Sequence, residues 1–256
     1  MSDAPRTSPE AAVELPAAAR VLALLDASRQ SLAALAAAVE LAAGRKAELV
    51  ALFVEDLDLL HSAAFPFSCE VGAQSGLARP LSPEGLEASL ARRVRRASQA
   101  LADAVAGREV RHRFQVSRGR VASEALALAG PGDVLVLGKA GLSGQWGVRL
   151  GSTSRALILE APCTVVIWDE RLRPSRGPLR LVSDAAPQLS DTALTALAPL
   201  FDGVEALPAM GATALARHLA LARNGALLLH RPELARLAEQ DPQLLARIPV
   251  PIIVVP

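Results

Sequence analysis

The sequence predicts an α/β protein built from two open parallel-sheet units in tandem, of which the second is shortened. Short apolar runs alternate with helical stretches along most of the chain, a pattern typical of βαβ units. The runs 20–25 and 48–54 flank a helix that we expect to begin near Gln30 and to end at Gly44. Two strands joined in this way should be parallel, with a right-handed crossover.

The first unit continues with the same alternation. Apolar residues recur every three or four positions from Leu86 to Val105, which predicts one amphipathic helix over 83–106. The stretch 55–82 before it is the least regular part, and its Phe65 and Phe67 either cover a ligand or, as we favour, pack on the sheet edge. We expect further strands over 109–117, 133–137 and 163–168, and helices over 121–129 and up to Glu160.

The second unit reads as a reduced copy of the first. The run 21–26 resembles 179–184, and the run 161–168 resembles 248–255, each pair sharing apolar pattern and ending. No counterpart of the 109–117 strand is found. We expect strands over 179–183, 204–207, 226–230 and 250–255, and helices over 189–200, 211–223 and 232–248. The predicted domains are therefore a disordered lead-in over 1–17, a first unit over 18–170, and a degenerate unit over 178–256.

Composition excludes several classes of function. The 256 residues carry a formal net charge of +1, so no overall field favours nucleic acid or a membrane surface. No apolar run approaches the roughly 20 residues that span a bilayer, and the N-terminus lacks the pattern of a secretory signal. Cys69 and Cys163 suit small apolar fillers better than a metal motif or a disulfide framework. We expect a cytoplasmic protein.

The strongest functional pattern follows the strand 133–137. Gly138, Gly141 and Gly151 are followed by Ser152 and Thr153, which open an apolar helix. Glycine lets a backbone approach a phosphate closely, and a helix N-terminus offers free N–H groups and a positive dipole end. A glycine-rich connector between a strand and a capped helix is the alternative interpretation.

Asp26 is the second polar feature at the same edge of the predicted sheet. It ends the first strand, as Gly138 ends the fourth, and in an open parallel sheet ligands bind where the strand order reverses. The alternative role of Asp26 is to cap the helix that follows, and the two roles are compatible.

Over about 20–168 these residues resemble the universal stress protein family. The match rests on Leu25-Asp26-Ala27-Ser28 and on the spacing Gly138, two residues, Gly141, nine residues, Gly151-Ser152. The resemblance implies a five-stranded parallel sheet ordered 3-2-1-4-5 that binds ATP or another adenine nucleotide, with or without Mg²⁺. It also implies residue roles: Asp26 beside the adenine-ribose end, the Val54 backbone at the base, Leu137 and Gly138 at the ribose and α-phosphate, and Gly141, Gly151, Ser152 and Thr153 at the phosphates.

The second unit lacks this pattern, since its fourth strand ends in His230-Arg231-Pro232. We therefore expect one nucleotide site, and we infer that the fold itself does not require the glycines. Family members often pair through their last strands, so the tandem resembles an intrachain pseudo-dimer; pairing of two chains stays open.

A regulatory, nucleotide-binding stress-response role with an unidentified protein partner is favoured, because no catalytic or metal-ligating set is evident. A slow ATP hydrolase and a nucleotide-free interaction module are the alternatives. Lys139 and Arg149 either neutralise phosphates or are solvated loop charges, and the arginines 92, 93, 95 and 96 are best explained as a solvated helix face.

Overall fold

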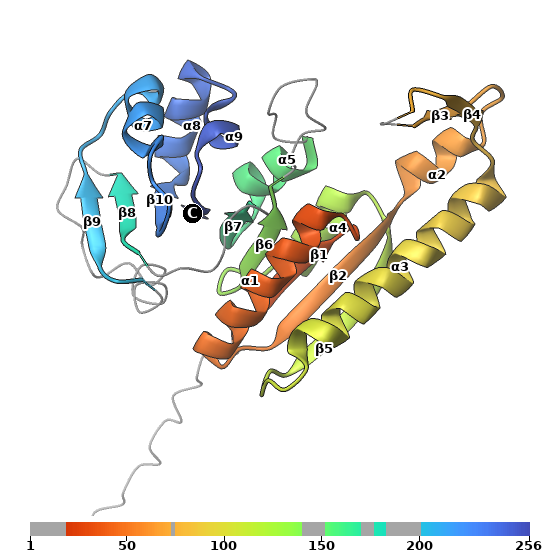
Figure 1. Cartoon of the computed structure of the whole chain (residues 1–256), viewed down its shortest axis with the longest axis horizontal. Coiled ribbons are helices and arrows are strands. Elements are labelled where there is room, and N and C mark those ends of the chain that lie inside the picture. Colours follow the sequence, from red (N-terminus) through yellow and green to blue (C-terminus); the bar gives the residue numbers. More distant parts are fainter. Residues whose placement is uncertain (1–18, 73–74, 140–151, 170–176, 183–200) are drawn as a thin grey trace, which may run out of the picture.

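The computed structural model describes residues 19–72, 75–139, 152–169, 177–182 and 201–256. Within these residues, nine strands form one sheet in the order β5-β2-β1-β6-β7-β11-β10-β8-β9 (Figure 1). The first five strands are mutually parallel, as are the last four, and the two blocks meet where β7 pairs antiparallel with β11. The predicted α/β class and the order 3-2-1-4-5 of the first unit are confirmed, but the two blocks share one continuous sheet.

The strands follow the predicted apolar runs closely. Those of the large sheet are β1 (Val21–Leu25), β2 (Leu49–Asp56), β5 (His112–Gly119), β6 (Val134–Gly138), β7 (Thr164–Trp168), β8 (Leu179–Val182), β9 (Val204–Leu207), β10 (Ala226–His230) and β11 (Ile252–Val255). The central strands are apolar on both sides because helices cover both faces, so their side chains are buried without alternation.

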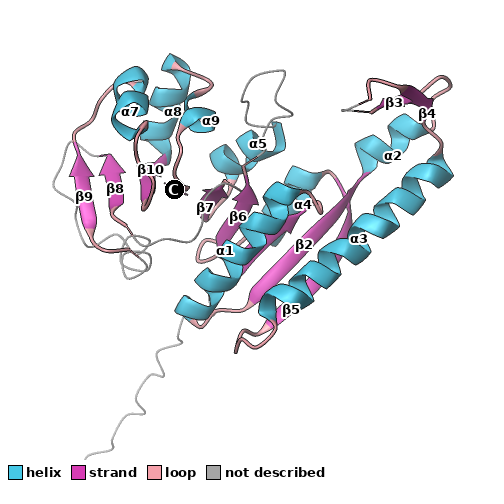
Figure 2. Ribbon diagram, viewed as in Figure 1, coloured by secondary structure: helices cyan, strands magenta, loops and turns pink. Residues whose placement is uncertain are grey.

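Helices cover the two faces of the sheet in separate groups (Figures 1 and 2). One face of the first half is covered by α1 (Arg29–Arg45) and α3 (Pro83–Val105). The other face of the first half packs against α4 (Val121–Leu128) and α5 (Ser152–Glu160). The same apolar cluster continues into the second half, where it includes α7 (Ala212–Leu219), α8 (Arg231–Gln240) and α9 (Leu244–Arg247). The apolar stripe predicted for α3 is confirmed, since Leu86, Leu90, Ala97, Leu101 and Val105 are buried.

Local chemistry sets the ends of α1. Ser28 is its N-cap and accepts a hydrogen bond from the backbone N–H of Ser31. The helix runs past Gly44, the predicted stop, to Arg45, and its C-cap Lys46 takes the left-handed conformation (φ 52°) that closes the last turn. The Gly44 prediction is wrong by two residues because the C-cap conformation falls on Lys46 instead.

The stretch 55–82 is more regular than its sequence indicates. It contains α2 (Leu57–Ala63) and a two-stranded ribbon of β3 (Cys69–Val71) and β4 (Ala78–Pro80). Phe65 and Phe67 do not pack on the sheet edge as we expected, because their side chains are 66% and 99% exposed. Phe67 also has a φ of 70°, a conformation that branched and bulky residues rarely adopt.

The second half differs from its predicted elements in its helices. The expected helix 232–248 is divided into α8 and α9 at Asp241 and Pro242, since proline interrupts helical hydrogen bonding. Helix α7 ends at Leu219, four residues short of the prediction. The predicted helix 189–200 and the lead-in 1–17 lie outside the described residues. The order β11-β10-β8-β9 follows that of the first half without a counterpart of β5.

The seam between the two blocks is symmetric. Ile167 pairs with Ile252, Val166 with Ile253, and Val165 with Val254. Since the runs before the two strands match in sequence, the seam is centred on the Val166–Ile253 pair, as two-fold symmetry would require.

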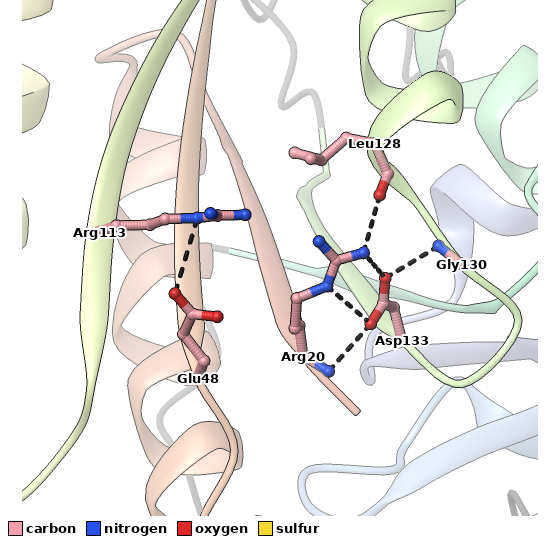
Figure 3. Close-up of polar contacts among 6 residues, drawn as sticks. All are labelled: Arg20, Glu48, Arg113, Leu128, Gly130 and Asp133. Carbon is pink, nitrogen blue, oxygen red and sulfur yellow. Dashed lines mark hydrogen bonds and ion pairs between the residues drawn. The ribbon is translucent and has the colours of Figure 1, made fainter. Parts of the chain in front are cut away.

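A polar cluster closes the N-terminal end of the β1–β6 pair (Figure 3). Arg20 pairs with Asp133, with Nη2 2.6 Å from Oδ2 and Nε 3.2 Å from Oδ1, and its Nη2 also donates to the Leu128 carbonyl. Asp133 further accepts from the backbone N–H groups of Arg20 and Gly130. Burial raises the pKa of Asp133, but these hydrogen bonds outweigh it and hold the pKa below its ordinary value. This cluster fastens the strands.

Candidate functional site

The candidate site lies at the opposite, C-terminal end of β1 and β6. The two strands are parallel neighbours, with Val21 beside Val134 and Ala23 beside Val136. Continuing this register brings the end of β1 beside Gly138. The chain leaves β1 toward β2 on one side, while β6 lies on the other, so the strand order reverses between them. This is the position where open α/β sheets bind ligands.

Asp26 is exposed at this edge and is held by the turn that leads into α1. Its Oδ1 accepts a hydrogen bond from the Ser28 N–H (2.9 Å), and its own N–H donates to Ser31 Oγ (3.3 Å). Its carbonyl accepts from Nε and Nη2 of Arg93 on α3, at 3.0 and 2.8 Å. The N-cap is Ser28, so the alternative role of Asp26 as the cap is wrong.

The Asp26 carboxylate is ionised at neutral pH. Desolvation raises its pKa, but hydrogen bonds from Ser28 and Ser31, together with the charge of Arg93, lower the pKa by more than desolvation raises it, so the net shift is downward. Ala27 takes a left-handed conformation (φ 62°) in the same turn. The turn thus presents a fixed negative charge at the C-terminal edge of β1 and β6.

Gly138 is required by packing. A Cβ built on it would lie 2.5 Å from the carbonyl carbon of Gln30 and 2.7 Å from the backbone nitrogen of Ser31, both in the first turn of α1. Any side chain would therefore push the N-terminus of α1 away from β6. The inference that the fold does not require the glycines is wrong for Gly138, because the backbone of α1 lies too close to it to leave room for a side chain.

Val54 lies at the same level as Asp26. The ladder between β1 and β2 ends with the Leu25–Phe53 pair, and β2 then continues to Asp56 paired only with β5. Val54 directly follows the last β2 residue that pairs with β1, so its backbone lies next to the turn at Asp26. The structure thus brings Asp26, Val54 and the end of β6 (Leu137 and Gly138) to one edge.

The helix α5 begins at this edge as well. Ser152 is its first residue and is exposed, and Thr153 is half-buried. The first N–H groups of any α-helix lack an intrahelical partner and form the positive end of its dipole. The predicted phosphate contacts Gly141 and Gly151, and also Arg149, lie outside the described residues.

Two residues at the edge have features that the sequence did not reveal. Ser117, which pairs in register with Val54, has a buried hydroxyl without a hydrogen-bond partner in the described part of the chain. Lys139 is buried, and its Nζ donates to the Ile248 carbonyl (2.6 Å) and lies 3.7 Å from Oδ2 of Asp169. The alternative role of Lys139 as a solvated loop charge is wrong, because the side chain is buried. A serine inside a strand and a lysine beside a glycine give no signal of such surroundings.

The cysteines and acidic residues of the described ranges were considered as metal ligands. Among the described residues, no three His, Cys, Asp or Glu side chains come together. Cys163 is buried, as expected of a filler, and burial raises its pKa to about 11. Cys69 is exposed on β3, so the filler prediction is wrong for it. Within the described ranges, no helix has both the length and the apolar character to cross a bilayer.

Comparison with solved structures agrees with the fold. A universal stress protein from Archaeoglobus fulgidus DSM 4304 has 14% identity and a TM-score of 0.56, covering 92% of this chain and 97% of its own. Universal stress protein UspA from Lactobacillus plantarum has 24% identity and a TM-score of 0.42, covering 58% and 96%. A universal stress protein in complex with cAMP has 23% identity and a TM-score of 0.34, covering 59% and 97%.

Comparison by sequence gives the family. No curated protein matches this chain significantly. The family model described as "Universal stress protein family", in contrast, matches residues 18–168, more than half of the chain and all of β1 to β7. The chain therefore belongs to the universal stress protein family.

Proposed function

We propose that the chain binds an adenine nucleotide, preferably ATP with or without Mg²⁺, at the C-terminal edge of β1 and β6, and acts as a regulatory stress-response module. The observation that carries the proposal is the meeting of Asp26, the backbone of Val54 and the end of β6 at the reversal of strand order. The proposed domains are 18–170, which holds the site, and a degenerate unit over 178–256.

The chemistry of this edge suits the parts of a nucleotide. An ionised carboxylate at Asp26 can accept hydrogen bonds from ribose hydroxyls or from the amino group of adenine. The backbone carbonyl of Val54 can accept a hydrogen bond from an amino group of the base. The N-terminus of α5, with Ser152 and Thr153, offers N–H groups and hydroxyls to phosphates, which is the usual means of anion binding by helices.

A regulatory role follows from binding alone. A ligand that prefers one conformation of a protein shifts the population toward it, and a partner can respond to that shift. Steady hydrolysis would additionally need a general base to position a water. We therefore keep a slow ATP hydrolase as the lesser alternative, which phosphate release under turnover conditions would detect.

The test is a thermal-shift series with ATP, ADP, AMP and GTP at millimolar concentration, with and without Mg²⁺. A nucleotide that binds at 100 times its Kd adds about 2.7 kcal/mol to the free energy of unfolding, which raises the melting temperature by several degrees. We expect ATP to raise it and GTP to raise it less. If none of the four changes it, the proposed function is wrong.

Gly151→Val gives the matching variant. We expect it to remove the ATP-induced shift while the ligand-free protein keeps its melting temperature, because the side chain would block the approach of a phosphate. Gly132→Val is the control, since a Cβ at Gly132 meets only the Ala19 methyl carbon at 4.0 Å, at the other end of the sheet. Equal ATP affinity in both variants would mean that the glycine loop is a connector.

One observation favours an additional protein partner. Phe65, Phe67, Val71 and Leu77, around the β3–β4 ribbon, have side chains that are 60–99% exposed. Clustered exposed apolar side chains commonly mark protein contacts. Sedimentation of the wild type against Phe67→Ser tests one form of this, the pairing of two chains: a dimer lost in the variant supports it, and a monomeric wild type refutes it.

A further inference from the structure

Two cations cross the seam between the halves at equivalent positions. Lys139 directly follows β6, and its Nζ donates to the carbonyl of Ile248 at 2.6 Å. Arg231 directly follows β10, and its Nη2 donates to the carbonyl of Ala161 at 2.6 Å, while its Nε donates to that of Ile158 at 3.1 Å. Each contact thus joins one half of the chain to the other.

The two contacts are related by the symmetry of the seam. β6 and β10 are the neighbours of the seam strands β7 and β11 in their own halves. Ala161-Pro162 precedes β7, and Ile248-Pro249 precedes β11, at matching distances from the central Val166–Ile253 pair. Each cation therefore follows the fourth strand of its half and binds the carbonyl before the fifth strand of the other, as in an isologous dimer interface.

The burial of these groups makes the contacts costly to lose. Lys139 is only 4% exposed, and a buried ammonium group without partners is strongly unfavourable. Arg231 is half-buried and binds the last carbonyls of α5, where the helix has unpaired acceptors and the negative end of its dipole. Lys139 thus satisfies the Ile248 carbonyl and ties the end of β6 to the second half, and Arg231 satisfies the Ile158 and Ala161 carbonyls and ties the end of α5 to the second half.

Both contacts act on elements of the candidate site. Lys139 adjoins Gly138 at the end of β6, and α5, which Arg231 holds by its C-terminus, carries Ser152 and Thr153 at its N-terminus. We propose that the second half serves as a built-in partner subunit that positions the β6 end and α5, with Lys139 and Arg231 as positioning residues for nucleotide binding. This proposal rests on the proposed function of the site.

The test compares Arg231→Met, Arg231→Lys and Lys139→Met with the control Arg180→Met. Arg180 lies within the second half, where it donates to the Asn224 carbonyl and pairs with Glu205, so its loss removes similar contacts away from the seam. We expect Arg231→Met to weaken ATP binding about tenfold by calorimetry, Arg231→Lys to weaken it less, and Arg180→Met to change it less than twofold. Arg231 is the decisive position, because it binds the C-terminal end of α5, opposite the end that would meet phosphates.

A second measurement does not depend on nucleotide. In ligand-free protein, amide hydrogen exchange over 134–139 and 152–160 should quicken in Arg231→Met and Lys139→Met, and stay unchanged in Arg180→Met. If exchange over these segments is unchanged in the seam variants, the coupling is refuted even if the wild type binds no nucleotide. If exchange quickens but ATP affinity is that of the wild type, the positioning role for binding is refuted and the proposed function stands.

Discussion

The two ends of the β1–β6 pair contrast in how they treat their polar groups. At the N-terminal end, Asp133 is buried and its oxygens accept hydrogen bonds from Arg20 and Gly130 (Figure 3). At the C-terminal end, Asp26 is exposed and is held by a turn, and Gly138 leaves room for α1. Both carboxylates have lowered pKa values, so a shifted pKa alone does not distinguish a fastening from a binding site. The exposure of Asp26, and its position where the strand order reverses, distinguish it from the buried Asp133.

Removing the charge of Asp133, at the N-terminal end of the β1–β6 pair, should have the largest effect on stability. Asp133→Asn leaves Arg20 without its carboxylate partner, and we expect a loss of about 3 kcal/mol in the free energy of unfolding, measured by urea denaturation. Glu48→Gln is the control, because its pair with Arg113 is exposed and 3.6 Å long. ATP affinity should be unchanged in Asp133→Asn. A loss of affinity with full stability would mean that the N-terminal end of the β1–β6 pair, and not its C-terminal end, binds the nucleotide.

Adding a side chain at Gly138, at the C-terminal end of the β1–β6 pair, should reduce stability somewhat less. Gly138→Ala places a Cβ against the backbone of Gln30, which must move, and we expect a loss of about 2 kcal/mol in unfolding free energy. Gly132→Ala is the matched control at the N-terminal end of the β1–β6 pair, where the new methyl group meets only the Ala19 methyl carbon, at an ordinary contact distance of 4.0 Å. Equal stability of the two variants would show that α1 yields without cost.

Acid should weaken the N-terminal end of the β1–β6 pair in a defined direction. A carboxyl whose pKa is lowered by folding stabilises the folded state above its unfolded pKa, about 3.9, and that contribution is lost as the pH falls through the lower, folded value. The difference in unfolding free energy between wild type and Asp133→Asn should therefore shrink below about pH 4. A difference that is constant from pH 7 to pH 3 would contradict the ionised Asp133.

Neutralising Asp26, at the C-terminal end of the β1–β6 pair, should have the smallest effect on stability. Asp26→Asn keeps a side-chain oxygen for the Ser28 N–H, so we expect a change of less than about 1 kcal/mol in unfolding free energy. ATP affinity, measured by calorimetry, should fall about tenfold, which corresponds to about 1.4 kcal/mol. A large loss of stability with normal ATP affinity would show that Asp26, like Asp133, stabilises the fold and does not bind the nucleotide.

Much of this arrangement was predictable from the sequence, for physical reasons. Strands and helices of the first half follow from hydrophobic period and length, and a βαβ connection allows one hand. The order of β5, β2, β1, β6 and β7 was expected from the resemblance to the family. Asp26 and Gly138 could be placed at one edge because each ends a strand, and parallel strands end together. These are properties of local pattern and of chain connectivity.

Contacts between distant segments decided the rest. The nearness of Gln30 to Gly138, the burial of Lys139 against Ile248 and the hold of Arg231 on α5 each join residues that local patterns treat as independent. The exposure of Phe65 and Phe67 was missed for the same reason, since an aromatic residue has no local mark of a missing neighbour. Sequence alone determined which segments become strands and helices and which strand ends meet. Only the tertiary structure decided which charges are buried, because burial depends on neighbours that the fold brings from elsewhere in the chain.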